Sequence, residues 1–274
     1  MRIKAFLSAV LLVLAGSMTA WPVFAEERID INGSTTVLPI AQKLAEAYMK
    51  DNPQVKISVS GGGSGNGIKA LIDGMTTIAD SSRFIKDSEV KLAVDKGAYP
   101  VPFAVAYDCI VPVVHPSSPV KNLSLAQLKA IYEGQITNWN AVGGPDLKIV
   151  VISRDTSSGT YEVWEEKVMK KERVFPGALL QASSGAIVQA VSKNKYAIGY
   201  VGIGYVDESV KALSVDGVEG TEATTLSGTY PISRPLFMFT RGWPAGATLH
   251  FINYTLHPQK GQKLVKEAGF VPLH

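Results

Sequence analysis

The sequence contains little cysteine, little histidine and little net charge, and each shortage excludes a class of protein. Cys109 is the single cysteine among 274 residues, so an intrachain disulfide is excluded and the core must stabilise the fold. The four histidines are scattered without the spacing of a metal site, and the sequence predicts neither a metal nor a cofactor. The formal net charge of +3 gives no support to nucleic-acid binding.

Beyond residue 25 the sequence has no apolar run long enough to cross a membrane. The first 25 residues follow the plan of a secretory signal peptide: basic Arg2 and Lys4, an apolar stretch over 5–14, and small residues that end at Ala25. We therefore expect cleavage after Ala25, a periplasmic location and a mature chain of about 249 residues that begins at Glu26. Because Arg2 and Lys4 leave with the peptide, the mature net charge is about +1.

Apolar residues recur with helical and strand periods in alternation along the mature chain. Residues 38–48 have apolar positions at helical spacing and Pro53 ends that segment, whereas 55–59 alternates apolar and polar residues as a strand does. Further predicted elements are a helix capped by Ser124, a strand over 149–152 with a helix from about Tyr161, a strand within 197–206 and a strand over 236–240. This alternation predicts an α/β fold with a mostly parallel sheet.

Three turns rich in glycine or hydroxyl residues stand where helices are predicted to begin. They cover 32–36 (NGSTT), 61–67 (GGGSGNG) and 154–160 (RDTSSGT). A helix start offers free N–H groups and a positive dipole end, glycine allows close approach, hydroxyls donate, and Arg154 can grip two oxygens. Taken singly, each turn is better explained by helix capping or a plain loop. Together the three favour an oxyanion site.

Motifs of nucleotide binding and of covalent catalysis fail on spacing. Ile68 stands where a phosphate-binding loop needs lysine, and also where the dinucleotide fingerprint needs its third glycine. Asn66 breaks the candidate nucleophile elbow around Ser64. Ser88 and Lys91 fit a lone S-x-x-K motif without its K-T-G companion, and we interpret them as a solvated helix face. The sequence therefore predicts a protein that is not an enzyme.

An ordered set of short motifs runs through nearly all of the mature sequence. It consists of INGSTT at 31–36, GGSG at 62–65, DSSR at 80–83, ITNW at 136–139, RDTSSGT at 154–160, SGA at 184–186, AIGY at 197–200 and YPISRP at 230–235. With these motifs the chain resembles the periplasmic phosphate-binding proteins of ABC transporters. The resemblance implies a two-lobed type II periplasmic binding protein fold with a hinge and an interlobe cleft.

The same resemblance implies lobe boundaries, a ligand set and partners. One lobe is expected to comprise 26–104 and 231–274 and the other 105–230, with crossings near 104–108 and 230–235. Phosphate is expected to be held without metal by backbone amides, hydroxyls, an arginine and a carboxylate. The expected ligand-binding residues are Ser34, Thr35, Thr36, Ser64, Asp80, Ser82, Arg83, Arg154, Ser158, Gly159 and Thr160. The implied protein is a monomer that delivers inorganic phosphate to the permease subunits of an ABC transporter.

Two positions depart from well-studied members of the family that the chain resembles. Those members carry aspartate at the positions of Thr156 and Ser82, so the carboxylate that accepts the proton of phosphate must lie elsewhere. Asp80 and Asp155 are the local candidates, and either could instead be a cap or a surface charge. We favour Asp80 because it ends an apolar strand segment, whereas Asp155 is beside Arg154 and can simply orient it.

Other functions stay open on the sequence. The site could serve another tetrahedral oxyanion, such as sulfate or molybdate. The scaffold could also carry a secreted phosphatase, although no residue pattern activates a nucleophile. A third alternative is an adhesin or scavenging protein that has no transporter partner.

The predicted signal peptide over residues 1–25 gives the first testable prediction. Intact-mass analysis of the exported protein should show a chain that begins at Glu26, because the apolar stretch ends in small residues at Ala25. A mass that retains residues 1–25 would contradict the signal-peptide interpretation.

Overall fold

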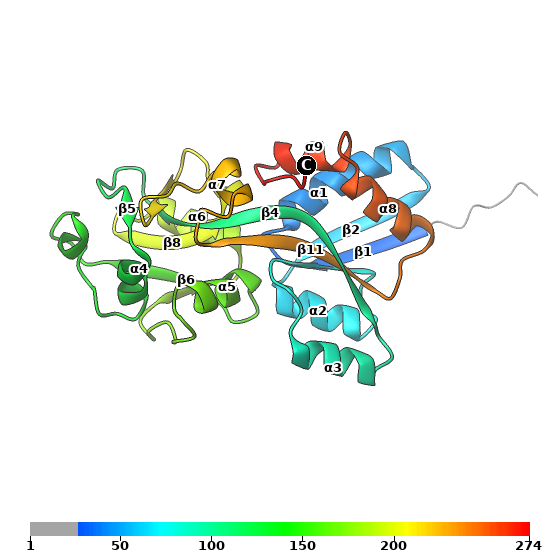
Figure 1. The fold of residues 1–274 in the computed structure, drawn as a ribbon, viewed down its shortest axis with the longest axis horizontal. Coiled ribbons are helices and arrows are strands. Elements are labelled where there is room, and N and C mark those ends of the chain that lie inside the picture. Colours follow the sequence, from blue (N-terminus) through cyan, green and yellow to red (C-terminus); the bar gives the residue numbers. More distant parts are fainter. Residues whose placement is uncertain (1–26) are drawn as a thin grey trace, which may run out of the picture.

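The structure, a computed structural model, describes residues 27–274, and the predicted signal peptide over 1–25 lies outside the described residues. The chain forms two lobes joined by two long strands, β4 (Pro100–Val114) and β11 (Ser233–Arg241) (Figure 1). We call the lobe that carries the first and last described elements the terminal lobe, and the other the central lobe.

The terminal lobe has three short strands and five helices. Its strands are β1 (Glu27–Gly33), β2 (Val55–Gly61) and β3 (Ile78–Ser81), and its helices are α1 (Leu38–Asp51), α2 (Ser64–Ile72), α3 (Asp87–Asp95), α8 (Gly246–Leu256) and α9 (Gly261–Glu267). The helix predicted from Leu38 and the strand predicted over 55–59 are confirmed as α1 and β2. One apolar cluster packs α1, α8 and α9 on one face of the sheet, and a second packs α2 and α3 on the other.

The central lobe contains the remaining strands and helices of the described chain. The strands are β5 (Asn122–Leu123), β6 (Val150–Arg154), β7 (Leu179–Gln181), β8 (Ala197–Gly202), β9 (Lys211–Ala212) and β10 (Ser214–Val215). The helices are α4 (Leu125–Tyr132), η1 (Trp139–Val142), α5 (Gly159–Lys167), α6 (Ser184–Ser192), η2 (Ile203–Tyr205) and α7 (Glu222–Leu226). The predicted cap of α4 is confirmed, since Ser124 Oγ accepts from Gln127 N at 3.0 Å.

The sheet is mixed, and this corrects the prediction of a mostly parallel one. Its order is β2-β1-β3-β11-β4-β8-β6-β7. Within each lobe the outer strands are parallel, as in β1 with β2 and β6 with β8, but β11 is antiparallel to β3 and β4, and β4 is antiparallel to β8. The reason is topological: the chain leaves the terminal lobe on β4 and returns on its neighbour β11, so the two strands must run in opposite directions.

Each lobe has its own core. The clusters of the terminal lobe draw on residues up to Ala106 and again from Leu236, whereas the cluster of the central lobe spans Cys109 to Ile232. In the central core the rings of Trp164 and Tyr200 stack with centroids 4.2 Å apart. Cys109 is free and buried, and burial raises the pKa of its thiol to about 12. β4 and β11 run between the two cores, and Tyr205 of η2 packs against both cores.

None of the helices within residues 27–274 is both long and apolar enough to span a bilayer.

Candidate functional site

The polar turns predicted from the sequence converge on the seam between the two lobes. Thr35 and Thr36 precede α1, Ser64 begins α2, and Thr160 lies in the first turn of α5. All four residues are buried, although each is polar. Parallel strands with helices between them place these helix starts at one edge of the sheet, which is why segments distant in sequence meet here.

The lobes are in direct contact across this seam. Thr36 Oγ1 lies 2.9 Å from Thr160 Oγ1, and Gly65 N donates to Ser157 O at 3.0 Å. A Cβ atom added at Gly159 would lie 2.5 Å from Ser64 Oγ and less than 3 Å from the hydroxyl of Ser82. Only glycine fits at 159 in this closed arrangement, so a ligand held here would be enclosed by both lobes.

The hydroxyl oxygens at the seam accept hydrogen bonds from fixed N–H groups. The pairs are Ser34 Oγ with Thr36 N (3.2 Å), Thr35 Oγ1 with Ser184 N (3.2 Å), Ser64 Oγ with Ser82 N (3.1 Å), Ser158 Oγ with Tyr161 N (3.2 Å) and Thr160 Oγ1 with Arg234 Nη2 (3.1 Å). A hydroxyl that accepts from an N–H keeps its own hydrogen for another partner. We call these five hydroxyls, with those of Thr36 and Ser184, the hydroxyl cluster. Some of these hydroxyls also lie within hydrogen-bond distance of one another, at 2.9–3.4 Å, and the cluster can donate its remaining hydrogens to an acceptor.

Arg154 brings a buried positive charge to the hydroxyl cluster. Its guanidinium donates to the carbonyl oxygens of Gln181 at 3.0 Å and Ala182 at 3.1 Å, and to Ser184 Oγ at 3.4 Å. The Asp155 carboxylate lies 3.6 Å from Nη2. Burial lowers the pKa of Arg154, but an arginine in a protein stays charged. A fixed guanidinium beside several hydroxyl donors suits an oxyanion.

Sequence reasoning missed three residues of the site: Ser184, Asp108 and Arg234. Arg234 donates through Nε (3.0 Å) and Nη2 (2.7 Å) to Asp108 Oδ2, and through Nη1 to the carbonyl oxygen of Ser82 at 3.0 Å. Asp108 is an acid within the otherwise apolar β4, and this interruption of the strand pattern could have identified it. Ser184 belongs to the SGA motif of the family resemblance, but it was not predicted to be a ligand contact.

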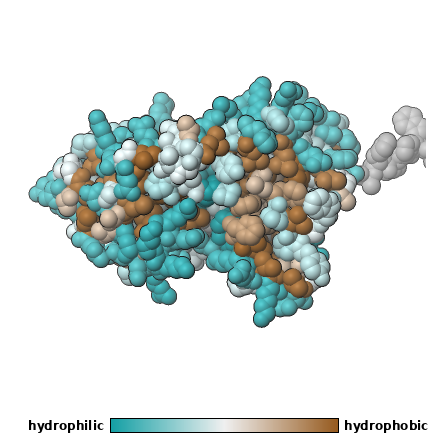
Figure 2. All heavy atoms as spheres, in the orientation of Figure 1, coloured by the Kyte–Doolittle hydropathy of each residue, from teal (hydrophilic) through white to brown (hydrophobic). Residues whose placement is uncertain are grey.

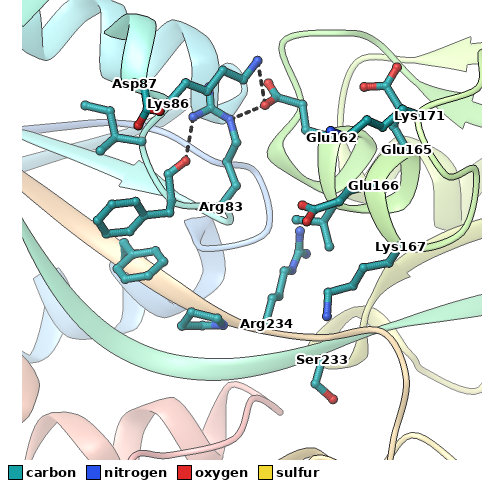
Figure 3. Close-up of a pocket in the computed structure, with 15 residues that line it drawn as sticks. Arg83, Lys86, Asp87, Glu162, Glu165, Glu166, Lys167, Lys171, Ser233 and Arg234 are labelled. Atoms are coloured by element: carbon teal, nitrogen blue, oxygen red, sulfur yellow. Dashed lines mark hydrogen bonds and ion pairs between the residues drawn. The ribbon is translucent and has the colours of Figure 1, made fainter. Parts of the chain in front are cut away.

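The structure directs Arg83 away from the hydroxyl cluster. Its guanidinium forms a two-armed pair with Glu89, with N–O distances of 2.7 and 2.8 Å, and Nε lies 2.6 Å from Glu162 Oε2 in the central lobe. Lys86 Nζ reaches the same Glu162 oxygen at 2.8 Å. Arg83, Lys86 and Glu162 line a groove of about 920 Å³ between the lobes (Figure 3), at the hollow that Figure 2 shows along the lower edge. Arg83 therefore joins the lobes at the rim of the seam.

The two candidate carboxylates have different surroundings. Asp155 Oδ1 accepts from Ser157 N at 2.9 Å, so this residue orders the turn that holds Ser158 and Gly159. Asp80 is fully buried, and among the described residues its Oδ1 has no hydrogen-bond partner. Burial raises the pKa of Asp80 well above its ordinary value, which favours the neutral acid. Asp80 is joined to the site through its backbone, whose carbonyl oxygen accepts from Ser34 N at 2.8 Å.

Comparison with known proteins gives a consistent result. Residues 24–259 match the family described as the PBP superfamily domain. The phosphate-binding protein PstS of Staphylococcus epidermidis is 39% identical over 253 residues, which cover 87% of this chain and 77% of that protein. PstS of Bacillus subtilis is 31% identical over 250 residues, 91% of this chain and 82% of that protein.

Solved structures agree over both lobes. A Clostridium perfringens protein, assigned as a phosphate ABC transporter substrate-binding protein and solved with bound phosphate, superposes with a TM-score of 0.85 at 36% identity, covering 90% of this chain and 100% of that one. An ABC-type phosphate transport receptor from Vibrio cholerae superposes with a TM-score of 0.72 at 36% identity, covering 89% and 99%.

The buried Asp80 generates a prediction about stability. A carboxyl group whose pKa is raised by folding contributes its stability below the pKa of the unfolded chain, about 3.9, and loses it as pH rises toward the folded value. Asp80→Asn has the same shape without the charge. In urea unfolding it should be more stable than the parent at pH 7, by roughly 1 kcal/mol or more, with a smaller difference at pH 4.

Asp95→Asn, at an exposed position, is the matched control and should leave both values nearly unchanged. A variant at Asp80 that is less stable at pH 7, with the same loss at pH 4, would contradict the assignment of a neutral acid.

Proposed function

This chain belongs to the PBP superfamily, and we propose that it is an extracytoplasmic receptor that captures inorganic phosphate and delivers it to an ABC transporter. The observation that carries the proposal is the hydroxyl cluster: donors from both lobes, each fixed by an N–H group, with the buried Arg154 beside them. A tetrahedral anion offers acceptor oxygens in several directions, and this arrangement supplies donors from several directions. The phosphate-binding relatives and the phosphate-bound neighbour support the same ligand.

We assign the ligand contacts to both lobes. The terminal lobe, 26–104 with 231–274, supplies the first turn and the Gly-rich turn, and the central lobe, 105–230, supplies the turn that begins at Arg154. The proposed contacts are Ser34, Thr35, Thr36, Ser64, Ser82, Arg154, Ser158, Gly159, Thr160 and, added from the structure, Ser184. Arg83 is reassigned to the contact between the lobes, because its guanidinium is occupied by two glutamates.

The remaining parts of the proposal concern processing, partners and chemistry. We propose that the mature receptor begins at Glu26, works in the periplasm as a monomer, hands phosphate to permease subunits and catalyses no reaction. Its named relatives are phosphate-binding proteins, which supports a transport role. Release of phosphate from a generic phosphomonoester by the pure protein would revive the phosphatase alternative.

Arg154 provides the direct test of the site. Arg154→Lys keeps the charge but loses the planar fork, and phosphate affinity measured by calorimetry should fall about tenfold to a hundredfold, since hydrogen bonds to charged groups contribute roughly 1.5–3 kcal/mol. Arg173→Lys, at an exposed position, is the matched control. Tight sulfate binding by the parent protein would overturn the phosphate assignment.

We keep Asp80 as the candidate acceptor of the phosphate proton, a role that requires its carboxyl group to be ionised in the complex. In Asp80→Asn, a narrowed preference for phosphate over sulfate would support this role, and an unchanged preference would exclude it.

Closure of the lobes is the second test. A ligand that touches both lobes binds the closed form better, so phosphate should lower the radius of gyration measured by solution scattering. Glu162 pairs across the seam with Arg83 and Lys86, and Glu162→Gln should weaken phosphate affinity about threefold to tenfold, with a smaller loss at high salt. Glu166→Gln, at an exposed position in the same helix, should have no such effect. Equal losses in the two variants would count against a specific contact across the seam.

A further inference from the structure

We infer that Arg234, held in place by Asp108, is a positioning residue that orients the hydrogen-bonded hydroxyls of Thr36 and Thr160 so that the pair donates toward the bound anion. The inference rests on the proposed function and assigns a part of the binding site to the strands that join the lobes. Arg234 and Asp108 are register partners on β11 and β4, at the point where both strands pass between the cores. Their side chains are 3% and 0% exposed, so the pair is enclosed by protein.

The first step is the contact of one guanidinium with both lobes. Arg234 Nη2 lies 3.1 Å from Thr160 Oγ1 in the central lobe and 3.4 Å from Thr36 Oγ1 in the terminal lobe. Nη1 donates to the carbonyl oxygen of Ser82 at 3.0 Å. Arg234 therefore meets one hydroxyl from each lobe where the seam closes. Figure 3 shows its side chain extending from β11 between the lobes.

The second step is the direction of the hydroxyl hydrogens. Thr36 Oγ1 and Thr160 Oγ1 are 2.9 Å apart, so one of the two hydroxyls donates to the other. Arginine is a donor only, and Nη2, which gives one of its two hydrogens to Asp108, offers the other to these two oxygens. Neither hydroxyl hydrogen can therefore point toward the guanidinium: one joins the two hydroxyls, and the other is turned away from Arg234, where it can donate to an oxyanion. Arg234 thus fixes the direction in which the Thr36–Thr160 pair donates.

The third step is the role of Asp108. Its Oδ2 accepts from two nitrogens of Arg234, and its Oδ1 accepts from Ile203 N at 3.0 Å. A Cβ atom added at Gly202 would lie 2.7 Å from Oδ2, so the backbone of β8 confines the carboxylate. Because Asp108 offsets the charge of Arg234, the pair contributes little net attraction for an anion. Its contribution is orientation, in contrast to Arg154, whose acidic neighbour is 3.6 Å away and partly exposed.

A double-mutant cycle on phosphate affinity tests this inference. The variants are Arg234→Lys, the double variant Thr36→Val with Thr160→Val, and their combination, each titrated with inorganic phosphate by calorimetry. Lysine cannot keep the Asp108 contacts and reach both hydroxyls, so Arg234→Lys should weaken binding about tenfold or more in the parent. With both hydroxyls already removed, the same substitution should weaken binding less than threefold, because its effect acts through them.

Two controls make the cycle specific. Thr35→Val removes a hydroxyl that accepts from Ser184 N and not from Arg234, and in this background Arg234→Lys should keep its full effect. Arg241→Lys, at the far exposed end of β11, should leave affinity unchanged. Urea unfolding without phosphate compares the stability of all variants, so that a loss of fold is separated from a loss of binding.

The outcomes are distinct. Losses that add in the cycle would overturn the inference while leaving phosphate capture intact. A parent protein that binds no phosphate would overturn the proposed function and the inference with it. If Arg234→Lys does not fold, the cycle is repeated with Asp108→Asn, which weakens the hold on Arg234 and keeps the guanidinium. Additive losses there would likewise overturn the inference.

Discussion

The antiparallel pairing of β4 with β11 is the constraint on which the rest of the structure depends. The two lobes have separate apolar cores, and these strands carry the chain out and back between them. Backbone hydrogen bonds pair the two crossings along Ser233–Arg241, with one register shift between Leu236 and Phe237, and they set Arg234 opposite Asp108. The positions of the helix starts, the seam and the hydroxyl cluster relative to one another depend on that pairing.

The seam is polar and buried, a combination that is costly unless each group has a partner. The structure provides a different partner for each kind of group. Backbone N–H groups satisfy the serine and threonine oxygens, carbonyl oxygens satisfy Arg154, and Asp108 satisfies Arg234. Some hydroxyls also pair with one another, and the remaining capacity of the cluster is that of hydrogen-bond donors, from hydroxyl hydrogens and guanidinium N–H groups. Asp80 is the exception, and it avoids the cost of a buried charge as the neutral acid.

Much of the fold could be predicted from local pattern. Apolar spacing identified α1, β2, α4 and β6, and the polar turns before α2 and α5 marked the helix starts that meet at the seam. The direction of the crossing strands could not be predicted, because it depends on where the chain returns. The ion pair of Arg83 with Glu162 could not be predicted, because the two residues are distant in sequence. Asp108 interrupts the apolar pattern of β4 and Arg234 lies in the YPISRP motif, but both were missed because their pairing depends on the fold.

The absence of a side chain at Gly159 has a consequence for the mechanics of the protein. Gly159 begins α5, where alanine is a better helix former, so a methyl group would be tolerated within the central lobe alone. Across the seam that methyl group would press on the hydroxyls of Ser64 and Ser82. It would hold the two lobes apart while every hydrogen-bond donor stays in place. One methyl group at position 159 would therefore turn a receptor that can close around its ligand into one that is open at rest.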